Sequence, residues 1–200
     1  MLEGNLIVGQ SGGPTSVINN SLCGIIREAK KSREIEGIYG MRFGVEGFMQ
    51  ENIIDLRHED EETIETLRDT PSSALGASRH KVKEDDLPRI LEILKKFNIR
   101  YFLMIGGNDT MHTIHKIEEY CAKEEHEIVC VGIPKTVDND LFGTDHAPGF
   151  PTAARFTVLS VKQEGVLARD MQKVDQFVIY QSIGRDAGWL SASAAAAKQK

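Results

Sequence analysis

Short apolar runs alternate with amphipathic segments along most of this chain, and that alternation limits the possible folds more than any other feature. The apolar runs predict strands, and the segments with helical spacing predict helices. Strands are expected at residues 5–9, 35–42, 100–105, 128–133 and 176–180, and helices at 15–33, 60–68, 85–97, 110–124, 151–173 and after 188. Residues 43–50 are glycine-rich and are expected to be irregular. With no hairpin signal between runs, the order predicts an α/β fold with a doubly wound, mainly parallel sheet and helices on both faces.

Length and charge exclude several classes of protein. The 200 residues suffice for one α/β domain, and a net charge of −6 argues against a general nucleic-acid surface. No run of about 18 apolar residues predicts a membrane span, and no secretory signal is visible, so we expect a cytoplasmic protein. Residues 191–200 have the composition of an unfinished helix, which suggests the front part of a longer protein.

Glycine-rich or charged turns follow four of the expected strands. They lie at Gly12 and Gly13, at residues 106–110, at 135–140 and at 184–185. Because parallel strands end at one edge of a sheet, these turns are expected to converge there. A turn that leads into a helix offers free backbone N–H groups to an anion, although each turn alone could be a simple strand-to-helix connection.

Two further stretches carry polar groups suited to phosphate chemistry. Residues 70–79 form a loop of small residues followed by His80 and Lys81, which fits either phosphate contact or a surface loop. Residues 134–140 (PKTVDND) follow a run expected to be a buried strand. In an extended segment Asp138 and Asp140 would point the same way and could hold a cation or act as base and orienter. The alternative is a polar loop with a turn at Asn139 and Asp140.

Phosphoryl transfer needs a phosphate cradle, a cation and a base for the attacking hydroxyl, and the converging turns supply these parts. The residues alone therefore predict a phosphotransferase with an aspartate base.

Four motifs, GQSGGPTSVIN, GGND, PKTVDND and IGRDAGW, make the chain resemble the phosphofructokinases from about residue 5 to 197, closest to the pyrophosphate-dependent branch. The resemblance implies phosphorylation of the 1-hydroxyl of fructose 6-phosphate. It also implies that residues 1–200 form the phosphoryl-donor-binding α/β domain with the start of the sugar-phosphate-binding part. The expected assembly is a homo-oligomer, with a dimer favoured.

The resemblance assigns roles residue by residue. Asp138 matches the general base, and Asp140 the aspartate that supports the base and the metal. Residues expected to bind the donor are Gly12, Gly13, Arg79, Gly107 and Asn108. Residues expected to bind the sugar phosphate are Thr136, Val137, Asp138, Ile183, Gly184 and Arg185, with isoleucine at 183 where the family usually has methionine.

Two positions indicate the donor. ATP-using relatives commonly carry glycine where this chain has Asp109 and Lys135. A carboxylate at 109 would occupy the space of a nucleotide α-phosphate, and the Lys135 ammonium would stabilise the leaving phosphate, so both are assigned catalytic roles with pyrophosphate. The alternatives are an ATP-dependent phosphofructokinase, a non-catalytic phosphate-binding relative, or an unrelated nucleotide-binding domain.

The expected cofactor is Mg²⁺. The family often has aspartate where this chain has Asn108, and an amide oxygen is a weaker ligand than a carboxylate. Because magnesium takes many ligands from water and substrate phosphate, we keep Mg²⁺ and expect Asp109 or Asp140 to hold it through water.

Overall fold

The computed structural model describes residues 2–15 and 17–198, which form two compact units that divide between Lys135 and Thr136. Each unit is described by itself. Ser16, inside the expected first helix, and Gln199 and Lys200, at the end of the last one, lie outside the described residues.

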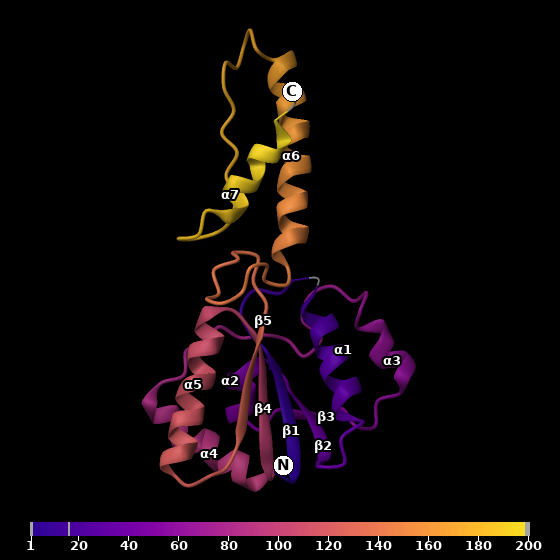
Figure 1. Cartoon of the computed structure of the whole chain (residues 1–200), viewed down its shortest axis with the longest axis vertical. Helices are drawn as coiled ribbons and strands as arrows, with labels where there is room; N and C mark the ends of the chain where they lie inside the picture. The colour runs from indigo at the N-terminus through magenta and orange to yellow at the C-terminus, as the bar shows by residue number, and fades with distance from the viewer. Residues whose placement is uncertain (1, 16, 199–200) are drawn as a thin grey trace. The chain divides into compact units, whose positions relative to one another are not determined.

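The first unit is built on a five-stranded sheet in the order β3-β2-β1-β4-β5 (Figure 1). Its strands are β1 (Gly4–Gln10), β2 (Ile35–Met41), β3 (Ile53–Asp55), β4 (Ile99–Gly106) and β5 (Val129–Pro134). β1 pairs in parallel with β2 and β4, and β4 pairs in parallel with β5. The predicted doubly wound parallel sheet is confirmed, and β1 lies at its centre.

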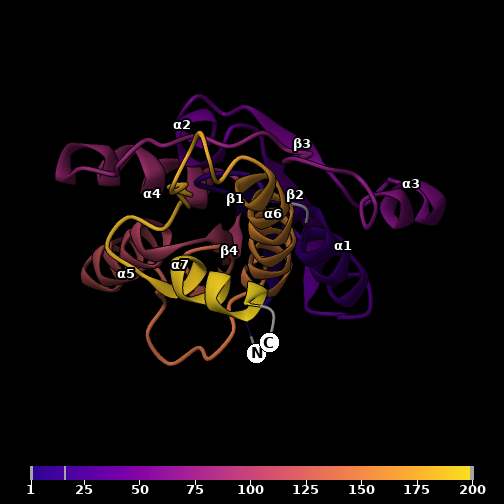
Figure 2. The ribbon, with the colours of Figure 1, turned by 90° about the horizontal axis from the view of Figure 1, so that it is seen from above.

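Helices cover both faces of this sheet, as predicted (Figure 2). They are α1 (Ile18–Ala29), α2 (Gly44–Met49), α3 (Glu61–Thr66), the short 3-10 helix η1 (Glu84–Asp86), α4 (Leu87–Lys96) and α5 (Asn108–Lys123). Alternate residues of β1 supply the two cores. Leu6 and Val8 pack with α1, whereas Ile7 packs with α2, α4 and α5.

Two predictions for this unit were wrong, and one strand was missed. Residues 43–50 are not irregular but contain α2, which begins after Phe43 in the left-handed region with φ +58. β3 was not predicted and pairs antiparallel with β2, because a three-residue strand is too short to show a period. β5 is not a buried strand, since Val129 and Val131 are exposed on this edge strand, which pairs only with β4 in the described part of the chain.

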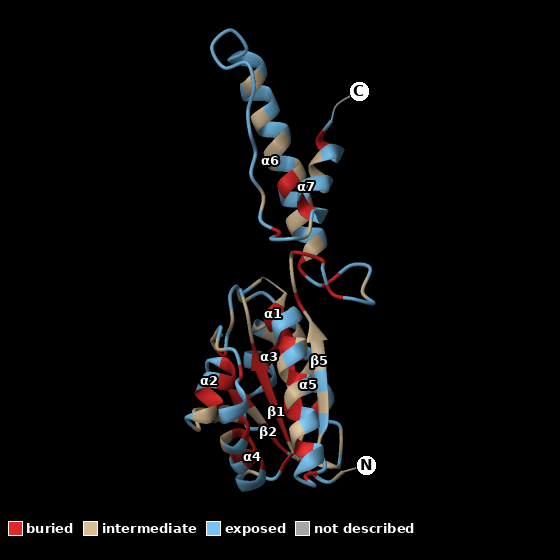
Figure 3. Ribbon diagram, turned by 90° about the vertical axis from the view of Figure 1, so that its left-hand side faces the viewer, coloured by how far each residue is buried: buried red, intermediate tan, exposed pale blue. Residues whose placement is uncertain are grey.

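The second unit consists of a loop, a long helix and two short helical segments. α6 (Phe150–Asp170) begins with Pro151 in its first turn, as predicted, and contacts α7 (Trp189–Ser193) and the 3-10 helix η2 (Ala194–Ala197). The predicted strand at residues 176–180 is absent, since these residues form no ladder within the described chain. The segment that follows α6 is exposed along most of its length (Figure 3), and Phe177 and Ile179 are among its exposed residues. An apolar run alone did not make a strand, because no neighbouring strand pairs with it in the described chain.

Among the described residues, no helix combines the length and apolarity that crossing a bilayer requires.

The turn from β4 into α5 yields a stability prediction. A Cβ on Gly106 would lie 2.1 Å from Thr110 Oγ1 and 2.6 Å from Thr110 Cβ, and Thr110 is itself buried. We expect Gly106→Ala to lower the free energy of unfolding by about 1–3 kcal/mol, measured by urea unfolding followed by circular dichroism.

Gly24→Ala is the matched control, because a Cβ on Gly24 meets nothing within 4 Å and Gly24 lies inside α1. We expect this change to raise stability by about 0.5–1 kcal/mol. Equal stability of the two variants would contradict the packing argument.

Candidate functional site

The candidate residues fall into a group in the first unit, ending with Lys135, and a group in the second, beginning with Thr136. The geometry below is that of each group separately.

Lys135 ties the end of β5 to the glycine turn formed by Gly12 and Gly13. Its side chain is buried, with the residue 3% exposed, and its Nζ donates to the Gly13 carbonyl oxygen at 2.7 Å. Gly12 has φ +75, and a Cβ there would lie 3.3 Å from Lys135 Nζ. The turn therefore needs glycine both for its backbone and for the close ammonium. A buried positive charge beside a glycine turn is suited to attracting an anion.

The start of α5 lies next to this lysine in the sheet. Gly106 pairs in register with Pro134, and the Lys135 backbone N–H donates to the Gly106 carbonyl oxygen at 3.0 Å. The expected adjacency of the turns after β4 and β5 is therefore confirmed. Gly107 caps α5 with extended backbone, and Asn108 and Asp109 follow with exposed side chains. Exposed oxygens at a helix N-terminus can contact a ligand directly.

Arg79 also lies close to the glycine turn. A Cβ built on Gly13 would lie 4.0 Å from an Arg79 terminal nitrogen, so the guanidinium borders the turn. An isolated parallel bridge between Ser11 and Ser78 brings the backbone before Arg79 alongside the turn. The structure thus brings Arg79 and Lys135 close to Gly12 and Gly13. The donor-binding role expected for Gly12, Gly13 and Arg79 and the catalytic role expected for Lys135 stay predictions.

The two basic residues after Arg79 take different positions. His80 bonds to Asp86 at 2.8 Å, and the pKa of that carboxyl is lowered, first by the Lys83 backbone N–H and then by His80. Lys81 is exposed, and its Nζ lies 3.9 Å from Asp109 Oδ1. Lys81 therefore joins the group through Asp109, while His80 is held by the start of η1.

Asp138 and Asp140 in the second unit have different surroundings, which corrects the expectation that they point the same way. The segment is not extended, because Asn139 between them has φ +54. Asp138 is buried and Asp140 is exposed. Oδ1 of Asp138 accepts no hydrogen bond from the described residues, and its Oδ2 lies 3.8 Å from Arg185 Nε. A buried carboxylate oxygen without a donor is available to accept a proton.

Asn139 holds the loop that carries Asp138. Its amide nitrogen donates to the Asp145 carbonyl oxygen at 2.9 Å, and its amide oxygen accepts from the Ala147 N–H at 2.7 Å. The Asp138 N–H donates to Thr136 Oγ1 at 3.1 Å, while Val137 is partly buried. These bonds fix the backbone of the PKTVDND segment although it lacks regular structure.

Gly184 and Arg185 lie in a tight turn that does not follow a strand, contrary to prediction. The Ala187 N–H donates to the Gly184 carbonyl oxygen at 2.8 Å, and a Cβ on Gly184 would lie 2.5 Å from the Ala187 oxygen. Ile183 and Arg185 are exposed. Within this unit, the exposed Arg185 side chain reaches back to the buried Asp138 carboxylate.

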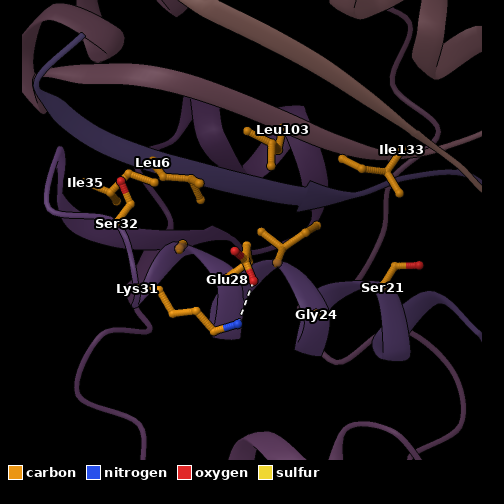
Figure 4. A pocket seen from close by; sticks show the side chains of 11 residues that line it. Leu6, Ser21, Gly24, Glu28, Lys31, Ser32, Ile35, Leu103 and Ile133 are labelled. Carbon is orange, nitrogen blue, oxygen red and sulfur yellow. Dashed lines mark hydrogen bonds and ion pairs between the residues drawn. The ribbon is translucent and has the colours of Figure 1, made fainter. Parts of the chain in front are cut away.

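A separate hollow of about 630 Å³ lies on the α1 face of the sheet (Figure 4). Lys31 and Glu28, which form an ion pair of 2.8 Å, line it together with apolar side chains. These apolar residues are Leu6, Ile25, Ala29, Ile35, Leu103 and Ile133. None of the candidate residues lines this hollow, so the candidate chemistry does not lie there.

Sequence reasoning missed the buried side chains of Gln10, Asn19 and Asn139. All three are amides that bond to loop backbone. Each lies within one of the quoted motifs. The motif sequence alone does not distinguish an amide that supports a loop from one that contacts a ligand. Lys81 was seen as a basic residue, but its pairing with Asp109 was not predicted.

The chain is similar to known proteins over almost its whole length. The chain is 41% identical over 199 residues to the pyrophosphate–fructose 6-phosphate 1-phosphotransferase of Rhodospirillum rubrum, covering 100% of this chain and 48% of that protein. It is 40% identical to the protein of that name from Xanthomonas campestris, covering 100% and 49%. The crystal structure of a pyrophosphate-dependent phosphofructokinase from Marinobacter aquaeolei superimposes with a TM-score of 0.89 at 36% identity, covering 98% and 50%.

The chain spans about half the length of the curated relatives it matches. The family described as Phosphofructokinase matches residues 5–200, and the chain therefore belongs to the phosphofructokinase family.

Proposed function

We propose that the protein transfers a phosphoryl group from pyrophosphate to the 1-hydroxyl of fructose 6-phosphate, giving fructose 1,6-bisphosphate and phosphate in a reversible reaction. The observation that carries the proposal is the buried Lys135 ammonium at the glycine turn, where ATP-using relatives commonly have glycine. The names of the relatives from Rhodospirillum rubrum and Xanthomonas campestris support the same donor and acceptor.

The donor is held by the first-unit group. The glycine turn and Arg79 surround the donor phosphates, and Lys135 stabilises the negative charge that builds on the leaving phosphate. Gly107 and Asn108 at the start of α5 contribute backbone N–H groups and an amide to the same anion. The negative charge of Asp109 repels the longer triphosphate chain of ATP and so disfavours ATP as the donor. Its carboxylate pairs with Lys81.

The sugar phosphate is held by the second-unit group, and Asp138 is its base. The 1-hydroxyl oxygen attacks the terminal phosphorus of pyrophosphate as the bridging phosphorus–oxygen bond breaks, and the proton passes to Asp138 Oδ1. Arg185 lies near Asp138 and balances its charge, while Thr136, Val137, Ile183 and Gly184 shape the surface that meets the sugar.

The residues present fit a Mg²⁺ ion that binds together with pyrophosphate. The described chain contains no group of three or more His, Cys, Asp or Glu side chains that could form a metal cage. Asn108, Asp109 and Asp140 offer exposed oxygens, the hard ligands that Mg²⁺ prefers, and each could hold it through water. When bound, the ion neutralises charge on pyrophosphate.

We further infer a homo-oligomer, with a dimer favoured, that works in the cytoplasm in glycolysis and its reverse. These inferences rest on the family resemblance of the four motifs.

Asp138→Asn tests the base. We expect the variant to fold and to lose about 10²–10⁴-fold in kcat, the usual contribution of a general base, with a smaller change in KM for fructose 6-phosphate. Fructose 1,6-bisphosphate formation is measured in a coupled assay on the full-length protein. Asp145→Asn, an exposed change in the same loop, is the control and should keep parental turnover. A loss below tenfold at Asp138 would remove the assignment.

Lys135→Met tests the donor. Methionine keeps the buried volume but removes the charge, so pyrophosphate-dependent kcat should fall by at least about a hundredfold, the scale of one lost electrostatic contact. Lys123→Met, at the exposed end of α5, is the matched control. Both donors are assayed in parallel. Normal pyrophosphate turnover in Lys135→Met, or a parent that prefers ATP, would favour the ATP-dependent alternative.

Calorimetry tests the metal. Because no cage of three ligands is present among the described side chains, we expect Mg²⁺ to bind weakly without pyrophosphate and to be required with it. Micromolar binding to the donor-free protein would contradict the proposal.

A further inference from the structure

Two buried amide side chains connect the glycine turn to the loop that leads to Arg79. Gln10, the last residue of β1, and Asn19, in the first turn of α1, are both 0% exposed. They lie just before and just after the glycine turn in the sequence. The loop consists of residues 70–78 and ends next to Arg79.

Gln10 uses both ends of its amide. Its Nε2 donates to Asn19 Oδ1 at 2.8 Å and to the Ile18 carbonyl oxygen at 3.3 Å, and its Oε1 accepts from the Leu75 N–H at 2.9 Å. The NH₂ end of the amide is therefore bonded to α1 and the oxygen end to the 70–78 loop. Only one orientation of the amide satisfies all three bonds.

Asn19 completes the connection. Its Oδ1 accepts from the Ala74 N–H at 2.8 Å as well as from Gln10, and its Nδ2 donates to the Thr70 carbonyl oxygen at 2.9 Å. The pair thus holds the loop at its beginning, through Thr70, and near its middle, through Ala74 and Leu75.

The 70–78 loop has little regular structure of its own to hold it in place. Further bonds come from Phe43, whose N–H donates to the Leu75 carbonyl oxygen at 2.9 Å, and from the bridge of Ser11 with Ser78. The Leu75 side chain is buried in the core on the α1 side. Losing the Gln10 oxygen would leave the buried Leu75 N–H unsatisfied, and losing the Asn19 oxygen would remove the partner of the Ala74 N–H. An unsatisfied buried N–H is costly enough to displace the loop.

We propose that Gln10 and Asn19 are positioning residues for the phosphoryl donor: they set the distance between the glycine turn and Arg79. The inference rests on the proposed donor role of this group. The glycine turn and Arg79 come from distant parts of the chain. The two amides link the turn to the 70–78 loop without adding charge. Because a misplacement of about 1 Å can cost about a hundredfold in rate, such a link would control donor use.

Two variants, one at each amide, test the link. Gln10→Met keeps the approximate length of the side chain and removes every hydrogen bond of the amide. Asn19→Asp keeps an oxygen for Gln10 and Ala74, removes the donor to Thr70 and adds an ionisable group at a buried position. Ile90→Val, a core change on α4 on the opposite face of the sheet, controls for destabilisation alone.

The test measures three quantities in the full-length protein. Hydrogen exchange gives the exchange rates of the Ala74 and Leu75 backbone amides. Calorimetry gives the affinity for pyrophosphate in the presence of Mg²⁺. Steady-state kinetics give KM for each substrate. For Gln10→Met we expect both amides to exchange at least about tenfold faster and pyrophosphate to bind at least about tenfold more weakly, since a buried hydrogen-bond partner is lost. KM for fructose 6-phosphate should change less than about twofold, because the second-unit group keeps its bonds. Asn19→Asp should show the same pattern, and Ile90→Val should show neither change.

Faster exchange with parental pyrophosphate binding, or an equal rise of both KM values, would overturn the positioning role. If Gln10→Met does not fold, Asn19→Asp decides, and parental donor binding there overturns the proposal. A parent that binds pyrophosphate but forms no fructose 1,6-bisphosphate overturns the proposed function instead, and the binding comparison still decides the positioning role. A parent that does not bind pyrophosphate overturns both.

Discussion

The parallel pairing of β1 with β2 on one side and β4 on the other is the constraint on which the first unit depends. Parallel strands run in one direction, so the glycine turn after β1 and the turns after β4 and β5 reach the same edge. Lys135, at the end of β5, can then reach back to the Gly13 carbonyl oxygen, although 122 positions separate the two residues. The parallel ladder therefore brings these turns to one edge of the sheet.

The positive charge beside the glycine turn comes from two local cations and not from the net charge of the chain. The chain is acidic overall, with a net charge of −6, yet the glycine turn is bordered by the Lys135 ammonium and the Arg79 guanidinium. Lys135 is buried whereas Arg79 is exposed, and a cation held in a poorly solvated position interacts more strongly with a phosphate than one in water does. The second unit uses burial differently, since it leaves one oxygen of Asp138 without a donor among the described residues.

The order of strands and helices in the first unit could be predicted, because apolar periodicity reports which face of an element is buried. The failures came where periodicity is uninformative. α2 has six residues and two glycines, β3 has three residues, and residues 176–180 have the composition of a strand without a partner. Among the candidate residues, Asp138 and Asp140 illustrate the limit, since a single left-handed residue, Asn139, separates a buried carboxylate from an exposed one.

The sequence by itself determined the family, the parallel α/β class and the residue types available at each turn, because motif spelling and apolar spacing are local properties of the chain. Only the tertiary structure decided which of those residues meet. The Lys135 bond to Gly13, the pairing of Lys81 with Asp109 and the Gln10–Asn19 link to the 70–78 loop all join distant positions. Such contacts depend on strand order and loop path, and no local pattern encodes the distance between two atoms that folding alone brings together.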